Sequence, residues 1–250
     1  MLWKKIVLIS FNVVLAVYLV LAMSAFNRPD TETVCHDMDI TIEDEAMPGF
    51  LTTGEVRKML VTDNLSPIGK SLETINLREM EEKLEAKELI EKAECWTTQD
   101  GTVNISIRQR IPVIRVMDNR GEDYYLDSQG RPMPSTEYSC KLIVCTGSIS
   151  RQYAAKVLAK LANIINGDRF WRNETVQLNI LADGSVELVP RVGYHIAYLG
   201  QPVRITKKLD RLRKFYRYGL NKAGWNKYSR ISVEYDNQII CKRKSQRDRW

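Results

Sequence analysis

An uncharged run near the N-terminus constrains the chain more than any other feature of its sequence. Residues 6–26 (IVLISFNVVLAVYLVLAMSAF) are 21 residues without a charged side chain. As an α-helix this run would be about 32 Å long, which matches the roughly 30 Å hydrocarbon core of a bilayer. The apolar region of a cleaved signal peptide is usually shorter, about 7–15 residues, although the small residues Ala22 and Ala25 leave that alternative open. We therefore expect an uncleaved membrane helix at residues 6–26.

The charges that flank this run predict its orientation. Lys4 and Lys5 precede it, whereas a single arginine, Arg28, and then several acidic residues follow it. Because positively charged flanks stay in the cytoplasm, we expect a cytoplasmic tail at residues 1–5. The rest of the chain would lie outside the cytoplasm, joined to the helix by a stalk at residues 27–37.

The formal net charge of +6 divides into an acidic and a basic segment. Residues 30–100 hold 18 acids against 7 bases, a net charge of −11, and residues 201–250 hold 4 acids against 15 bases, a net charge of +11. Outside the cytoplasm, the basic segment would meet anionic headgroups, acidic wall polymer or an acidic protein rather than nucleic acid. A solvated helix face is the simpler alternative. Contact between the two segments would allow weak self-association that salt screens.

Local patterns predict an α+β fold with two domains outside the membrane. Residues 38–110 have the order β-α-α-β-β, with Thr52 and Asn76 as helix caps and Asp100-Gly101 as the turn of a hairpin. From Pro112 onward the chain is rich in short strands, interrupted by helices near residues 150–166 and 205–220. This predicts a mixed, mainly antiparallel β domain over residues 111–243. A basic tail at residues 244–250 would follow it.

The sequence offers few candidates for catalysis or metal binding. The corner from Asp127 to Gly130 has the composition of a type I turn and lacks the further oxygen ligands of a metal loop. The five cysteines include no Cys-x-x-Cys pair and are accompanied by only two histidines. We expect His36 to be solvated and His195 to be structural. No nucleophile elbow or zinc-binding helix motif occurs, so we predict no catalytic residue, metal site or cofactor.

Several stretches resemble the bacterial cell-division family FtsQ/DivIB. The most specific is the passage LIEKAEC, then GTVNISI, then RIPV at residues 110–113. The loop at residues 69–76, the corner at residues 125–130, and the helix at residues 205–216 followed by ISVEYD (residues 231–236) are also similar to the family. The resemblance implies a short cytoplasmic tail, one membrane helix, a POTRA domain and a β domain.

The resemblance also implies a function. It suggests a non-enzymatic divisome scaffold of the inner membrane at the division septum, with the N-terminus cytoplasmic and the C-terminal domain periplasmic. The implied partners are FtsB/FtsL-like coiled-coil membrane proteins and septal wall synthases. Two alternatives remain open from the sequence. One is a POTRA-type chaperone in outer-membrane protein assembly or secretion, and the other is a membrane-anchored cell-wall enzyme.

We predict that partners bind a C-terminal hairpin at residues 230–243, whose outer strand, residues 238–243, or its neighbour would form a sheet edge. A partner segment would add to this edge as a further strand. The predicted binding residues are Glu234, Tyr235, Ile239, Ile240 and Arg243. Arg243 and the basic helix would attract an acidic segment, whereas Glu234, where many members of the family carry a base, would prefer a basic residue opposite it. The alternative is that Tyr235 and both isoleucines are core residues.

Overall fold

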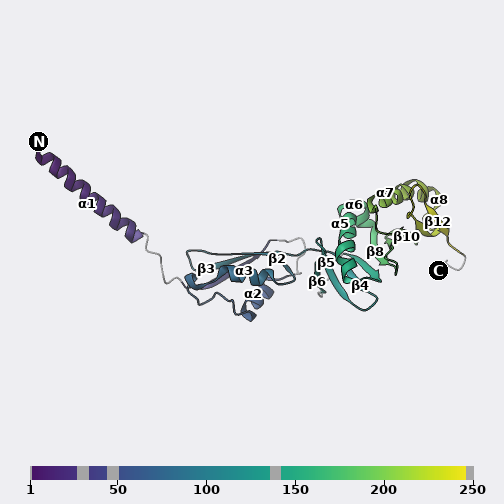
Figure 1. Cartoon of the computed structure of the whole chain (residues 1–250), viewed down its shortest axis with the longest axis horizontal. Coiled ribbons are helices and arrows are strands. Elements are labelled where there is room, and N and C mark those ends of the chain that lie inside the picture. Colours follow the sequence, from purple (N-terminus) through teal and green to yellow (C-terminus); the bar gives the residue numbers. More distant parts are fainter. Residues whose placement is uncertain (1, 27–33, 44–50, 136–141, 246–250) are drawn as a thin grey trace. The chain divides into compact units, whose positions relative to one another are not determined.

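The computed structural model describes residues 2–26, 34–43, 51–135 and 142–245. The chain divides into two compact units, one with residues 1–41, 53–84 and 93–107 and the other with residues 42–52, 85–92 and 108–250. Figure 1 shows the elements of both in chain order. Most of the predicted stalk and of the basic tail, residues 27–33 and 246–250, lies outside the described residues.

The N-terminal helix α1 extends over Leu2–Phe26 and includes the whole uncharged run. In the part of the chain that the structure describes, no helix meets the length and apolar character that a membrane crossing requires. The side chains of residues 2, 4–9 and 24–26 of this helix lie outside the described set. The predicted membrane helix therefore stays a prediction.

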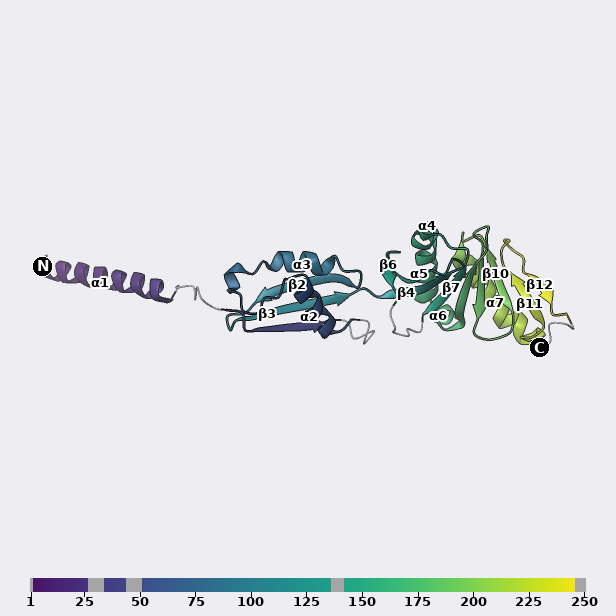
Figure 2. The ribbon, with the colours of Figure 1, turned by 90° about the horizontal axis from the view of Figure 1, so that it is seen from below.

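The first unit is built around a three-stranded sheet in the order β1-β3-β2. Its helices lie beside this sheet (Figures 1 and 2). In chain order its elements are β1 (Asp37–Ile42), α2 (Thr53–Thr62), the 3₁₀ turn η1 (Leu72–Thr74), α3 (Leu77–Glu85), β2 (Ile90–Thr97) and β3 (Thr102–Gln109). The predicted order β-α-α-β-β is confirmed.

Local signals explain where these elements begin. The predicted cap Asn76 accepts a hydrogen bond from the Glu79 backbone N–H (3.1 Å), and its amide donates to the Glu79 carboxylate (3.2 Å). The β2–β3 hairpin is closed by a 3.0 Å hydrogen bond from the Thr98 N–H to the Thr102 carbonyl. Gly101 has φ 86°, so the predicted Asp-Gly turn supplies the positive φ that the hairpin needs.

The second unit contains a nine-stranded sheet in the order β12-β11-β10-β9-β8-β7-β4-β5-β6. Among the described strands, β10–β11, β7–β8 and β4–β7 pair in parallel, and the other five pairs are antiparallel, as predicted. The strands are β4 (Pro112–Asp118), β5 (Asp123–Asp127), β6 (Pro132–Pro134), β7 (Ile143–Gly147), β8 (Thr175–Ile180), β9 (Val186–Pro190), β10 (Ile196–Gly200), β11 (Tyr228–Ser232) and β12 (Ile240–Arg243).

Helices cover one face of this sheet (Figure 2). They are α4 (Arg151–Tyr153), the π-helical turn η2 (Ala154–Leu158), α5 (Ala159–Gly167), α6 (Arg169–Glu174), α7 (Ile205–Phe215), the π-helical turn η3 (Tyr216–Leu220) and α8 (Asn221–Ala223). Leu158 and Leu161 from the first helical stretch and Leu209 and Leu212 from α7 join alternate strand residues such as Leu188 in one core. The two predicted helices are confirmed, and α6 is an element that the sequence analysis missed.

The corner from Asp127 to Gly130 is a turn, as predicted. The Gly130 N–H donates to the Asp127 carbonyl (3.0 Å), and the Asp127 carboxylate accepts from the Gln129 and Arg131 N–H groups (both 2.9 Å) and from the Arg131 side chain (2.6 Å). Gly130 has φ 82°, and a Cβ added there would lie 2.2 Å from the Ala155 carbonyl oxygen. The corner therefore both turns the chain and packs closely against η2.

Candidate functional site

Strand β12 forms one edge of the nine-stranded sheet. It pairs on one side with β11, antiparallel, with Ile231 opposite Cys241 and Ser232 opposite Ile240. Among the described strands, none lies beyond it in the sheet order. An edge strand presents unpaired backbone N–H and C=O groups, and these can pair with another segment unless the protein blocks them.

The other end of the same sheet is blocked by its sequence. Strand β6 has three residues, and two of them, Pro132 and Pro134, are prolines that lack a backbone N–H. Short edge strands and prolines are common devices against strand pairing.

On both edge strands of the three-stranded sheet, side chains form hydrogen bonds with backbone N–H or C=O groups. In β1, the Met38 N–H donates to the Asp37 carboxylate (2.8 Å) and the Met38 carbonyl accepts from Arg57 (2.9 Å). The Thr98 N–H at the end of β2 points toward β3. Because successive backbone N–H groups of a strand point to opposite sides in the plane of the sheet, the N–H of Cys95, three residues earlier, points away from β3. That outward N–H donates to the Glu81 carboxylate of α3 (2.7 Å).

Strand β12 lacks such a block. In the described part of the chain, the Lys242 carbonyl accepts a long hydrogen bond (3.4 Å) from the Ser229 hydroxyl of the paired strand β11, and no side chain hydrogen-bonds to the backbone of Ile240, Cys241 or Arg243. The strand also contains no proline. Among the four edge strands of the described sheets, β12 is therefore the one best suited to strand addition.

The side chains of the outer strand divide between two faces. Ile239 and Cys241 pack against the core, so for Ile239 the core alternative holds in part. Because neighbouring residues of a strand point to opposite faces, Ile240 points away from this core, and 52% of it is exposed. Arg243 is exposed as well. The strand is shorter than the predicted residues 238–243, since β12 begins at Ile240.

The predicted late strand is also too long, because β11 ends at Ser232 and leaves Glu234 and Tyr235 outside the sheet. Arg211 of α7 explains this end: its guanidinium donates to the Val233 carbonyl (2.9 Å) and the Tyr235 carbonyl (2.5 Å). Arg211 also donates to the Asp236 carboxylate (2.7 Å). This hydrogen bond is the main cause that lowers the pKa of Asp236.

We call this arrangement the Arg211 clamp: the Arg211 guanidinium with the Val233 and Tyr235 carbonyls and the Asp236 carboxylate. It turns the backbone after β11 toward α7, so that strand pairing stops and the connection to β12 begins. Asn237, with φ 62°, completes the turn. Tyr235 stands at the outside of this connection with 55% of its surface exposed, so it is not a core residue.

Glu234 is half-buried and lies over β10. A Cβ added at Gly200 would approach the Glu234 side chain to 2.7 Å, and Gly200 has φ 66°. The positive φ therefore favours glycine here, and a larger residue would also displace the Glu234 side chain. Glu234 packs within its own domain, so the sequence prediction that it faces a basic residue of a partner is not tested.

Some basic residues of helix α7 stabilise the domain from within, and others are exposed on its surface. Lys208 is buried, and its ammonium donates to the carbonyls of Leu199 (2.7 Å) and Gln201 (2.8 Å). Burial lowers the pKa of Lys208. Lys208 and Arg211 are thus structural, whereas Lys207 and Lys214 are exposed. The burial of Lys208 could have been predicted from the sequence, because Lys208 lies on the apolar side of the helix together with Leu209 and Leu212.

His195 is a structural residue, as predicted. It is 2% exposed, and its Nε2 lies 2.8 Å from the Tyr216 hydroxyl. The rings of His195 and Trp225 both pack beside Tyr216. Burial, with a smaller effect of Lys244, lowers the pKa of His195 to about 4. His36, on the other unit, is exposed.

Two protein-family models match the chain, and their borders lie close to those of the two domains that the sequence predicts. Residues 111–242, more than half of the chain, match the family described as FtsQ/DivIB, C-terminal related. Residues 33–108 match the POTRA-like domain family. No individual curated protein matches the chain.

Proposed function

Because the chain belongs to the FtsQ/DivIB, C-terminal related family, we propose that it is a non-enzymatic scaffold of the cell-division machinery. In this role it recruits other membrane-anchored division proteins and links them to septal peptidoglycan synthesis. The POTRA-like match over residues 33–108 supports the same role, since both families are generally non-enzymatic. The partners that we propose are FtsB/FtsL-like coiled-coil proteins and septal wall synthases.

The observation that carries the proposal is the open edge of β12. Of the other three edge strands, β6 is short and contains two prolines, and β1 and β2 have backbone groups that hydrogen-bond to side chains. A partner segment that pairs with β12 would gain about 0.5–1.5 kcal/mol net for each main-chain hydrogen bond. Main-chain pairing supplies affinity in this mode, and side-chain contacts supply specificity.

The side chains around this edge indicate the kind of segment that fits. Ile240 and Tyr235, both more than half exposed, offer apolar contacts. Lys242 and Arg243 are exposed bases of the same strand. We therefore propose a partner segment with an apolar residue opposite Ile240 and acidic residues near the bases. The predicted binding set then keeps Tyr235, Ile240 and Arg243 as contacts, whereas Ile239 and Glu234 support the hairpin from within.

We also propose that residues 6–26 anchor the scaffold in the inner membrane. The support is the uncharged run of 21 residues and the two lysines before it. The N-terminus would be cytoplasmic, and the chain after the membrane helix would be periplasmic at the division septum. The domain borders that we propose are residues 38–110 and 111–243.

The proposal can be tested in cells depleted of the natural chain. Ile240→Asp places a charge on the exposed face of β12, and Val203→Asp is the matched control, because Val203 is 62% exposed outside that strand. We expect depletion to produce filaments that wild type and Val203→Asp rescue and Ile240→Asp does not, at equal protein levels. Rescue by Ile240→Asp would contradict the site. Loss of outer-membrane barrel proteins without filaments would favour the chaperone alternative.

A further inference from the structure

One end of the second unit gathers basic residues from three segments of the chain. We call these segments the basic end: residues 190–200, 214–230 and 240–245. They hold one, five and three Lys or Arg residues, nine in total, and no Asp or Glu. The segments meet where the His195 Nε2 lies 2.8 Å from the Tyr216 hydroxyl. They also meet where the Lys244 N–H donates to the Lys227 carbonyl (3.1 Å). The resulting field favours an anionic partner.

The turn between β9 and β10 carries exposed apolar groups at this end. Val192 is 49% exposed and Tyr194 is 77% exposed, and Ile196, at the start of β10, is 38% exposed. The Lys244 ammonium lies 4.9 Å from the centre of the Tyr194 ring. Tyrosine is enriched at the interface between membrane and water, because its ring enters the headgroup layer, and neighbouring bases keep their charge at the polar surface. The turn therefore has the chemistry of a membrane-interface contact.

Helix α6 and a glycine hold this turn in shape. The Arg191 N–H donates to the Glu174 carbonyl (2.6 Å), and the Arg191 side chain donates to the Asn173 carbonyl (2.7 Å). The Val192 N–H donates to the Glu174 carboxylate (3.0 Å). Gly193 has φ 89°, which glycine adopts without strain. The turn is therefore preformed, and a bound surface would not have to order its backbone.

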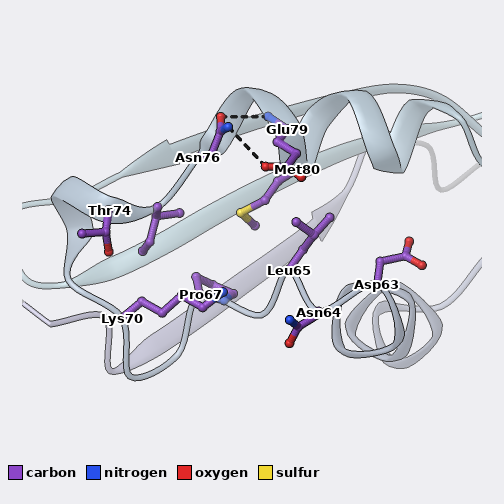
Figure 3. A pocket seen from close by; sticks show the side chains of 10 residues that line it. Asp63, Asn64, Leu65, Pro67, Lys70, Thr74, Asn76, Glu79 and Met80 are labelled. Carbon is purple, nitrogen blue, oxygen red and sulfur yellow. Dashed lines mark hydrogen bonds between the residues drawn. The ribbon is translucent and has the colours of Figure 1, made fainter.

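A hollow of the first unit, between the end of α2 and the beginning of α3, differs in this respect (Figure 3). Figure 3 shows Asp63 and Asn64 at the end of α2 and the mutual hydrogen bonds of Asn76 and Glu79. None of the apolar residues that line the hollow is exposed, and Met80 is completely covered. The hollow thus offers polar and charged groups alone, whereas the basic end combines charge with exposed apolar side chains.

An anionic bilayer surface matches both properties of the basic end. Lipid phosphates attract the bases, and the headgroup layer covers the valine and the tyrosine ring. A soluble polyanion would satisfy the bases but would leave these apolar groups in water. The proposed membrane anchor at residues 6–26 would also keep the basic end close to a bilayer, so that a contact of low intrinsic affinity can form.

We propose that the basic end binds the anionic surface of the membrane in which the chain is anchored. Val192 and Tyr194 would enter the headgroup layer, and the surrounding bases would contact lipid phosphates. The contact would hold the second unit at the bilayer. This inference rests on the proposed membrane anchor, but it does not depend on strand addition at β12, and its test changes no residue of that strand.

The test uses the full chain in lipid nanodiscs of zwitterionic phosphatidylcholine, with or without anionic phosphatidylglycerol. Hydrogen exchange at residues 191–195 is measured by mass spectrometry in both lipids, and the ratio of the two rates is compared between variants. For wild type we expect exchange at least about threefold slower with phosphatidylglycerol. The slowing should become smaller at high salt, because salt screens the attraction between the bases and the phosphates.

Three double variants separate insertion from charge attraction. Lys222→Glu/Lys227→Glu should abolish the slowing, since each base near an anionic bilayer contributes about fivefold to the affinity. The matched control is Lys156→Glu/Lys207→Glu, which makes the same charge change at exposed bases outside the three segments and should keep the slowing. Val192→Ser/Tyr194→Ser keeps every base, and it should lose the slowing because the inserted groups are gone.

Equal exchange of wild type in the two lipids would overturn the proposal. Slowing that Val192→Ser/Tyr194→Ser retains, or that the control variant loses, would overturn it as well. The same slowing by soluble polyglutamate in phosphatidylcholine nanodiscs would indicate an acidic protein segment instead. A chain that does not enter nanodiscs would contradict the membrane anchor, and the same exchange comparison with added vesicles of the two lipids would then decide whether the basic end binds.

Discussion

The Arg211 clamp allows a quantitative prediction for Arg211→Ala. The substitution removes three hydrogen bonds, to the carbonyls of Val233 and Tyr235 and to the carboxylate of Asp236. Hydrogen bonds with a charged group contribute about 1.5–3 kcal/mol each when they are buried. Tyr235 and Asp236 are more than half exposed, so water replaces much of what is lost there. We therefore expect the free energy of unfolding of the second unit to fall by about 2–3 kcal/mol.

The matched control is Arg217→Ala, which removes an exposed arginine from the adjoining turn η3. Surface changes of this kind usually alter stability by less than about 0.5 kcal/mol. Urea unfolding of the full chain, followed by tryptophan fluorescence, measures both variants, and hydrogen exchange should be faster at residues 233–237 in Arg211→Ala alone. If Arg211→Ala unfolds like Arg217→Ala and exchange at these residues is unchanged, the clamp does not hold the hairpin.

Three other expectations concern the same chain. Burial lowers the pKa of His195 from 6.5 to about 4. The contribution of neutral His195 to the free energy of unfolding should therefore be fully present above pH 6.5 and decrease, by up to about 3 kcal/mol, as the pH falls toward 4. Urea unfolding of wild type and His195→Asn over this pH range measures the His195 contribution as the difference between the two profiles. Identical profiles would contradict the prediction. Gly130→Ala should lower the melting temperature far more than Gly121→Ala: both have positive φ, but only Gly130 has a backbone atom within 4 Å of an added Cβ. Limited proteolysis should give a stable fragment that begins near residue 111, and a chain that never yields this fragment would argue against a domain border there.

Much of the first unit followed from local sequence signals. The Asn76 cap, the Asp100-Gly101 turn and the apolar positions of the helices each act within a few residues, so the order β-α-α-β-β was predictable. The corner from Asp127 to Gly130 was predictable for the same reason. What local patterns did not reveal was its tight contact with Ala155, which depends on the fold of the second unit.

The errors near the candidate site have a common physical cause. ISVEYD alternates like a strand, yet β11 ends at Ser232, because Arg211 binds carbonyls 22 and 24 residues later in the chain. Helix α6 was missed because its six residues are too few for a periodic pattern, and its signal is the cap Asp168, which accepts from the Phe170 and Trp171 N–H groups. Two of the blocks on the edge strands, from Arg57 to Met38 and from Glu81 to Cys95, are likewise contacts between residues distant in sequence, whereas the prolines of β6 and the Asp37 carboxylate act locally.

The central claim, that β12 is the edge to which partners add a strand, can be tested most directly by a crosslinking scan in dividing cells. A photoreactive amino acid is placed in turn at positions 238–243 of the full chain, with Pro134 on the opposite edge as the control position. We predict that positions 240 and 242 capture a membrane-anchored division protein through a short extended segment, identified by mass spectrometry, whereas position 134 captures none. Equal capture at position 134, or no capture along β12 in cells that divide normally, would contradict the account.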